Sequence, residues 1–296
     1  MDPAALAFIA VAAVLHAGWN ILLKTAGDPL RTATVGMVAV SVVLVPAALL
    51  GWWLLDRPAL PPAVWAIGVV SGVLEAAYFV TLTAAYRRGD LSVVYPLARG
   101  TALVLAVVVG VVILQEHLAP LALAGVALLV VGLLVVQRPW RLLGRGGDDR
   151  AAAGFALLTG LVIVSYTALD RAAVQQAPPW LYAALLWPVS AVTLVAIDAI
   201  RTRAASSGHV APPEAVDTRT AIIGGFATFG AYAFVLAALS RAPLAVVAPL
   251  RESAVVLISA WGVLRLREGG EGREGALRIA GSALVLVGAV AVGAAR

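Results

Sequence analysis

The chain has no cysteine and only three histidines among its 296 residues. The lack of cysteine excludes disulfides, thiolate catalysis and sulfur ligands for a metal. His16, His117 and His209 have no neighbours at the spacing of a metal site, so we expect no metal and no cofactor. The sequence also lacks the motifs of zinc proteases, P-loop nucleotide sites and nucleophile elbows. It therefore does not indicate an enzyme.

Charged residues are scarce as well. They make up 12% of the chain, and hydrophobic residues make up 62%, whereas a soluble domain is about a quarter charged and about half apolar. The apolar residues fall in long runs, such as 102–114 and 118–136. Such runs approach the roughly 20 residues that cross a hydrocarbon core of about 30 Å. The composition therefore predicts an integral, multi-pass membrane protein.

Turn signals divide the chain into ten apolar segments. The predicted spans are 3–23, 33–55, 62–86, 91–114, 118–137, 151–171, 180–200, 220–239, 244–266 and 275–294. Lipid offers no hydrogen-bond partners, so each span must be a helix. The predicted fold class is all-α, with ten transmembrane helices. A cleaved signal peptide is not expected, because no basic residues precede the apolar residues 4–15.

The two halves of the chain resemble each other. Residues 84–97 align with 237–250, and residues 124–132 align with 280–288. We predict a five-helix repeat over 1–140, a basic linker over 141–150 and a second five-helix repeat over 151–296. Because each repeat has an odd number of spans, the two repeats enter the membrane in opposite directions. This inverted-repeat arrangement is typical of transporters.

The distribution of positive charge predicts the orientation. If both termini lie on one side, that side carries four arginines: Arg57, Arg171, Arg241 and Arg296. The opposite side carries fifteen lysines and arginines, including those of the whole linker. The positive-inside rule then places both termini outside and the linker in the cytoplasm. We expect a bacterial-type inner (plasma) membrane protein.

Several features recur at matched positions of the two halves. They are a proline early in spans four and nine (Pro96, Pro249), an acid that closes these spans (Glu116, Glu268), and glycines seven apart in spans five and ten (Gly125, Gly132 and Gly281, Gly288). In these features the chain resembles the drug/metabolite transporter (DMT) superfamily, in particular its EamA-like ten-helix group. The resemblance implies secondary transport of metabolites, often export. The chain departs from the common pattern at Arg99, Arg251 and Glu252, because these spans are usually neutral there.

Opposite charges occupy matched positions in spans four and nine. When Pro96 is superposed on Pro249, Arg99 falls on Glu252. A charge at mid-membrane costs about 3 kcal/mol, so neither residue should face lipid. Two interpretations stay open and are compatible: an ion pair that locks the repeats together, or a substrate or gate site between them.

Other residues of spans one, four and nine extend this candidate binding site. Tyr95 lies on the face of Arg99, and an arginine fork binds carboxylates or phosphates. Arg251 either completes an anion site or pairs with a carboxylate, and Trp19 and Asn20 are further candidates. Tyr95 alone is as often a packed aromatic residue. Pro96 and Pro249 remove backbone hydrogen bonds, and such helix breaks often line a cavity.

Two residues are candidates for proton coupling. Glu75 lies in the middle of span three beside Tyr78 and Phe79, where a carboxyl group suits a proton carrier. It is equally consistent with a carboxyl group that pairs with Arg251. His16 titrates near neutral pH when unperturbed, although a lone membrane histidine more often bonds a neighbouring helix.

Three charged residues near span ends are predicted to reach into the headgroups: Lys24, Asp170 and Arg171.

These observations predict a secondary transporter that works by alternating access. The substrate cavity should lie between the repeats, lined by spans one, three, four, six, eight and nine. The favoured function is export of a small anionic or zwitterionic metabolite, with proton coupling. The partners are the small-molecule substrate and membrane lipids, without nucleic acid, as a monomer or a homodimer. The alternatives are a lipid-headgroup or lipid-carrier translocase and a non-transporting membrane scaffold.

Overall fold

The computed structural model describes residues 2–24, 27–55, 57–88, 91–137, 147–207, 214–252 and 273–295. All regular elements within these ranges are helices. They are α1 (Pro3–Lys24), α2 (Pro29–Leu54), α3 (Pro62–Tyr86), α4 (Leu91–Val108), the π-helical turn η1 (Val109–Ile113), α5 (Pro120–Gln137), α6 (Gly147–Val174), α7 (Pro179–Ser206), α8 (Thr218–Leu239), α9 (Leu244–Glu252) and α11 (Arg273–Ala294). The predicted all-α fold is confirmed, and most bounds agree within a few residues.

Two helices extend beyond their predicted spans for polar reasons. α2 begins at Pro29 because the Asp28 carboxylate accepts hydrogen bonds from the backbone N–H groups of Leu30 and Arg31. α7 continues to Ser206, past the apolar segment that ends near residue 200. Hydropathy locates the lipid-facing part of a helix, whereas caps and polar contacts decide where the helix ends.

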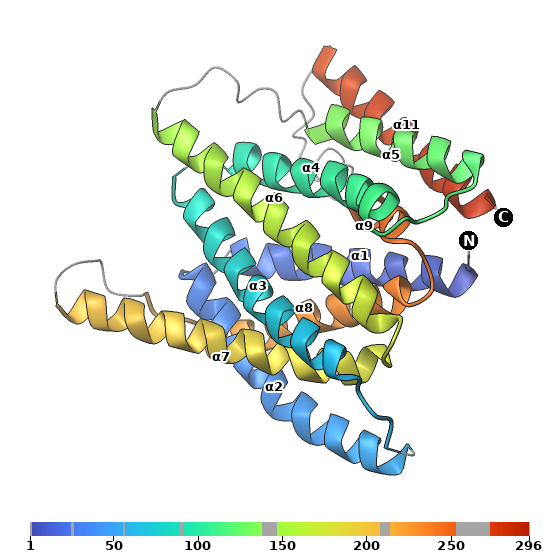
Figure 1. Cartoon of the computed structure of the whole chain (residues 1–296). Coiled ribbons are helices and arrows are strands. Elements are labelled where there is room, and N and C mark those ends of the chain that lie inside the picture. The colour runs from blue at the N-terminus through green and yellow to red at the C-terminus, as the bar shows by residue number, and fades with distance from the viewer. Residues whose placement is uncertain are drawn as a thin grey trace.

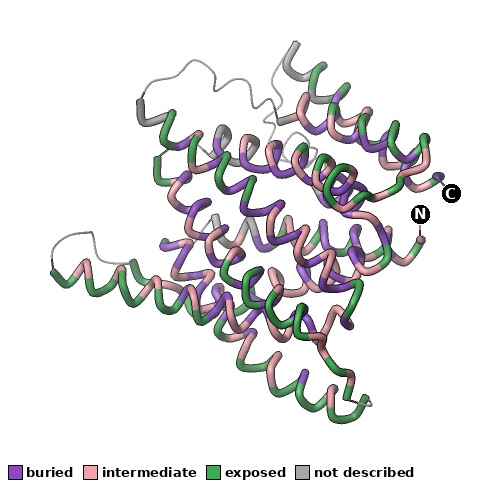
Figure 2. The backbone as a smooth tube through the Cα atoms, viewed as in Figure 1, coloured by how far each residue is buried: buried purple, intermediate pink, exposed green. Residues whose placement is uncertain are grey.

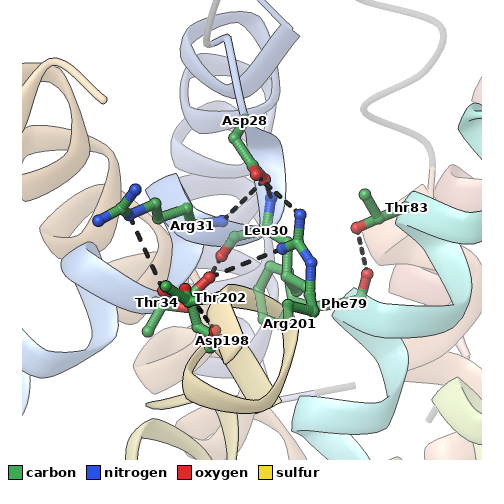
Figure 3. Close-up of polar contacts among 9 residues, drawn as sticks. All are labelled: Asp28, Leu30, Arg31, Thr34, Phe79, Thr83, Asp198, Arg201 and Thr202. Carbon is green, nitrogen blue, oxygen red and sulfur yellow. Dashed lines mark hydrogen bonds and ion pairs between the residues drawn. The ribbon is translucent and has the colours of Figure 1, made fainter. Parts of the chain in front are cut away.

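A charge network joins the start of α2 to the end of α7 (Figure 3). The Arg201 guanidinium lies 2.9 Å from Asp28 and 3.7 Å from Asp198, and Arg31 lies 3.8 Å from Asp198. Burial raises the pKa of Asp28, but hydrogen bonds from Arg201 and from the Arg31 amide outweigh it, so this pKa is lowered overall. The network fixes the second helices of the two halves to each other.

The two halves pack against each other in a reciprocal pattern. The first helix of each half packs on the third helix of the other, as α1 with α8 and α6 with α3. The second helices, α2 and α7, contact each other, as do the fourth helices, α4 and α9, and the fifth helices, α5 and α11. α1 and α6 run in opposite senses, and both ends of the chain lie on one side of the molecule (Figure 1). The fold is therefore two inverted five-helix repeats.

We call the side with both chain ends the terminal side and the opposite one the linker side. The exact repeat boundaries at residues 140 and 150 remain a prediction, since residues 138–146 lie outside the described ranges.

The repeated glycines form the contact between α5 and α11. A Cβ atom at Gly125 would lie 2.8 Å from the carbonyl oxygen of Gly288, and one at Gly132 would lie 2.7 Å from that of Gly281. No real side chain tolerates this distance to backbone, so only glycine permits such close packing. The glycine pairs seven apart are thus a packing surface inside one chain.

The outer surface of the molecule is apolar. Exposed residues follow the outer faces of the helices (Figure 2), and many are large and aliphatic, such as Val42, Ile279 and Val290 at 68%, 73% and 72% exposure. Among the described helices, five are long and apolar enough to cross a membrane unaided. Aliphatic surface of this extent needs lipid around it. The protein is an integral, multi-pass membrane protein.

Candidate substrate cavity between the two halves

A cavity of about 460 Å³ lies between the two halves. Its lining comes from α1, α3, α4, α6, α8 and α9, the six helices that the sequence predicts. The lining residues are Ala12, His16, Trp19, Glu75, Tyr78, Phe79, Arg99, Tyr166, Thr228, Ala231, Tyr232, Val235 and Arg251. Five of the residues singled out in the sequence therefore meet at one cavity: His16, Trp19, Glu75, Arg99 and Arg251.

A second cavity of about 350 Å³ continues from the first one towards the linker side. The two cavities share Trp19, Phe79 and Thr228. Farther out, the second cavity is lined by Leu22 at the end of α1 and by Thr220 at the start of α8. The central cavity is thus continued towards the side on which the basic linker lies.

Two buried arginines bring positive charge to the cavity. Arg99 on α4 and Arg251 on α9 are only 3% and 6% exposed. The guanidinium of Arg99 lies 2.7 Å from Nε2 of His16 and donates a hydrogen bond of 3.4 Å to the hydroxyl of Tyr78. Guanidinium groups at this depth are suited to bind a carboxylate or phosphate through two parallel hydrogen bonds.

His16 lies between two hydrogen-bond donors. Its Nδ1 accepts a hydrogen bond from the indole Nε1–H of Trp19 at 3.1 Å, and its Nε2 faces the Arg99 guanidinium. A protonated imidazole carries an N–H group on both nitrogens and accepts from neither donor, whereas a neutral imidazole accepts on one nitrogen. The geometry therefore fits a neutral His16 that accepts the hydrogen bond from Trp19. It does not favour His16 as the proton carrier.

Glu75 reaches the cavity without a hydrogen-bond partner on one oxygen. The residue is 5% exposed, and its Oε2 atom has no partner among the described residues. No ion pair joins Glu75 to Arg251 in the part of the chain that the structure describes. Of the two interpretations of Glu75, the geometry is therefore consistent with a carboxyl group that exchanges a proton or contacts a substrate.

Asp170 is fully buried, so the prediction that it reaches into the headgroups was wrong. It accepts hydrogen bonds from the hydroxyls of Ser71 at 2.5 Å and Tyr182 at 2.7 Å, and from that of Tyr232. These donors lie on α3, α7 and α8, so one carboxylate holds three neighbouring helices. The signal in the sequence was the spacing of Ile163, Tyr166 and Asp170, which places Asp170 on the inward face of α6.

Aromatic rings line the remainder of the cavity. The rings of Tyr78 and Tyr166, and those of Tyr166 and Tyr232, have centroids 6.3 Å apart. The rings of Trp19 and Phe79 are also 6.3 Å apart. These packed rings form an aromatic wall beside the charged groups.

Glu116 and Arg171 join the two halves on the terminal side. The Glu116 carboxylate accepts hydrogen bonds from the backbone N–H groups of Leu244 at 2.7 Å and Ala245 at 3.0 Å, which begin α9. It also accepts one from Nε of Arg171 at 3.2 Å, and Arg171 donates to the carbonyl of Leu239. Arg171, like Asp170, was wrongly expected in the headgroups. We call these contacts the terminal-side lock.

The predicted helix breaks are not present in the described residues. α4 runs through Pro96 and α9 runs through Pro249 without interruption. Each proline is the sixth residue of its helix, so it removes only one intrahelical hydrogen bond near the helix start.

Several predicted site residues are not placed in full. The side chains of Asn20, Tyr95 and Glu252 lie outside the described part of the structure, as do Glu268 and the side chain of Lys24. The pairing of Arg99 with Glu252 therefore stays a prediction. Within the described ranges, no three metal-ligating side chains come together.

Residues 3–138 match the model of the EamA-like transporter family. The match covers the first of the two repeats, and over these residues the chain is similar to this family of the drug/metabolite transporter superfamily. Its members are membrane transporters, and in general they are not enzymes. The chain is accordingly a membrane transporter of this type.

A known crystal structure supports the fold over the full length. This structure, described only as "Crystal structure of protein", superposes with a TM-score of 0.71 over 99% of this chain and 98% of that chain, at 15% sequence identity. At this identity the similarity concerns the fold alone. No curated protein matches the sequence significantly.

Proposed function

We propose that this EamA-like transporter is a secondary-active exporter of a small anionic or zwitterionic metabolite, such as an amino acid, an organic acid or a phosphonate. The observation that carries the proposal is the pair of buried arginines, Arg99 and Arg251, at a cavity between the two halves. A guanidinium group binds a carboxylate or phosphate through two parallel, charge-assisted hydrogen bonds. Two of them at one cavity favour a substrate with an anionic group.

The other cavity residues favour a compact substrate with more than one kind of group. Glu75 places a carboxyl group in the same cavity as the arginines, and Trp19 and Phe79 add an apolar wall. A zwitterion with its anionic end at the arginines and its amine towards Glu75 makes use of all three features.

Export follows from the two ends of the cavity. The cavity continues towards the linker side, and the terminal-side lock of Glu116 and Arg171 closes the other side. The positive-inside rule assigns the linker side to the cytoplasm. Substrate would then bind from the cytoplasm and leave when the halves rock and the lock opens. Proton binding at Glu75 on the outer side and its release inside would drive the cycle.

The test is a thermal-shift screen of the purified protein against amino acids, organic acids, phosphonates, amines and sugars. A ligand at a hundred times its Kd stabilises its target by about 2.7 kcal/mol. We expect stabilisation by one anionic or zwitterionic class, which is lost in Arg99→Ala. Arg57→Ala, which removes an exposed arginine outside the cavity, is the matched control and should leave the shift unchanged. Stabilisation by amines or sugars alone would overturn the proposal.

A further inference from the structure

Two carboxyl groups beside the cavity are supplied very unequally with hydrogen-bond donors. Asp170 on α6, at 0% exposure, accepts hydrogen bonds from three hydroxyl groups. Glu75 on α3, at 5% exposure, has a buried oxygen with no donor among the described residues. Ser71, which donates to Asp170, lies one helical turn before Glu75 on the buried face of α3, so the two carboxyl groups are neighbours.

The difference in donors indicates how charge is divided between the two groups. A buried carboxylate is stable only when donors or a cation compensate for its lost hydration. Asp170 has three donors, so it suits the ionised form. Glu75 has an oxygen without a donor, which suits the neutral form. Two negative charges here would in addition repel each other.

We propose that Glu75 and Asp170 form one proton-binding site, in which a single exchangeable proton resides on Glu75 while Asp170 is ionised. The pair therefore titrates as a unit. Glu75 lines the cavity, so its proton is taken from, and released to, the water of that cavity. Tyr232 lines the same cavity and donates to Asp170, which makes it a positioning residue between the cavity and the buried charge.

Among the described residues around the cavity, the Glu75–Asp170 pair is the carboxyl site that can exchange a proton. The titratable or charged residues that face it are His16, Tyr78, Arg99, Tyr166, Tyr182, Tyr232 and Arg251. Tyrosine and arginine side chains as residue types titrate far above neutral pH. His16 lies between two donors and fits the neutral form.

The proton site deepens the proposed function, and only its role in transport rests on that function. Its test is the infrared band of protonated carboxyl groups, recorded on purified protein at about pH 7 without substrate. We expect a band that is lost in Glu75→Gln and weakened in Asp170→Asn, because without the Asp170 charge Glu75 loses its proton more readily. Tyr232→Phe and Ser71→Ala should shift the frequency of the band. Asp217→Asn, at an exposed helix cap, should leave the band unchanged.

Two results would overturn the inference. A band that persists in Glu75→Gln would place the proton elsewhere, and a band unaltered by Asp170→Asn would show that Glu75 does not share its proton. If Asp170→Asn does not fold, Ser71→Ala removes only one donor and decides the question by the presence or absence of the frequency shift. Because no transport is measured, a failed search for anionic substrates would refute the proposed function and leave the proton site untouched.

Discussion

Glu75 lines the cavity from α3, in the first half of the molecule. The residue aligned with it in the second half is Thr228 on α8, which also lines the cavity. On α6 of the second half, Asp170 binds three hydroxyls; the aligned residue of α1 is Leu23. Arg99 likewise aligns with an acid, Glu252. The ionisable residues around the cavity therefore do not match between the two halves.

The packing residues of the two halves do match. Each helix contact between the halves has a counterpart related by the repeat symmetry, such as α1 with α8 and α6 with α3. The glycines of α5 likewise face those of α11. Symmetric packing allows two related arrangements of nearly equal free energy, which alternating access requires. The unmatched charges differ between the two sides of the cavity, and we propose that they select the substrate.

The largest effect is expected where the symmetric packing is broken. In Gly288→Leu the side chain would collide with the backbone of α5, because even a Cβ atom would lie 2.6 Å from the Gly125 carbonyl oxygen. Overpacking costs about 1–3 kcal/mol or more, and a backbone collision belongs at the upper end. We expect little folded protein in size-exclusion chromatography. Gly154→Ala, where a Cβ atom meets nothing within 4 Å, is the control. Equal yields of both variants would contradict the packing role.

The next effect tests the unmatched positive charge. Arg99→Ala should abolish detectable transport, and Arg99→Lys should weaken binding by about 10–100-fold, because lysine keeps the charge and loses the planar fork. Binding measured by titration calorimetry separates the two variants. Equal affinity of Arg99→Lys and wild type would show that only charge matters at this position.

Glu75 and Thr228 allow the two halves to be compared at one depth. Glu75→Gln should remove the pH dependence of transport, since it replaces the proton carrier by a group that does not titrate. Thr228→Val, at the aligned position, should keep that dependence. Initial rates in proteoliposomes between about pH 5 and 8 give both profiles. If Glu75→Gln retains the wild-type profile, the coupling proton binds elsewhere.

The terminal-side lock can be weakened by Glu116→Gln. The neutral amide loses charge-assisted hydrogen bonds worth about 1.5–3 kcal/mol, which should raise the population open to the terminal side by about tenfold or more. The natural chain has no cysteine, so Val235→Cys in the cavity reports access to an impermeant maleimide. Arg57→Cys, in the loop between α2 and α3, measures the background rate and the sidedness. If Val235→Cys is labelled no faster in the Glu116→Gln background than in the wild-type background, the result argues against the lock.

The smallest effects are expected at two helix caps. Hydrogen bonds from the hydroxyl and the amide of Thr220 lower the pKa of Asp217, and the contacts of Asp28 also lower its pKa. A lowered pKa stabilises the fold above the ordinary value of 3.8, and this stability is lost as pH falls through the lowered value. Asp28→Asn should reduce stability at neutral pH by about 1 kcal/mol. Asp217→Asn, at an exposed cap, should have a smaller effect. We expect the difference in melting temperature between each variant and the wild type to be smaller at about pH 3 than at about pH 7. A larger difference at pH 3 would contradict the stabilising role of the ionised carboxylates.

Much of this architecture could be predicted from the sequence because the membrane simplifies it. Apolar length predicted most of the described helices to within a few residues, and the duplication with an odd number of spans in each half predicted the inverted repeats. The errors concern polar residues near helix ends. Asp170 and Arg171 were assigned to the interface by their sequence position, whereas hydroxyls on three other helices and the start of α9 decide where they lie. Local sequence does not reveal such partners.

The most direct test is transport by proteoliposomes of the compound that stabilises the protein in the thermal-shift screen. With a proton gradient across the membrane, we predict that the wild type moves this compound against the proton flux, that Arg99→Ala moves none, and that Glu75→Gln no longer responds to the gradient. Movement by Arg99→Ala at the wild-type rate would contradict a substrate site at the buried arginines.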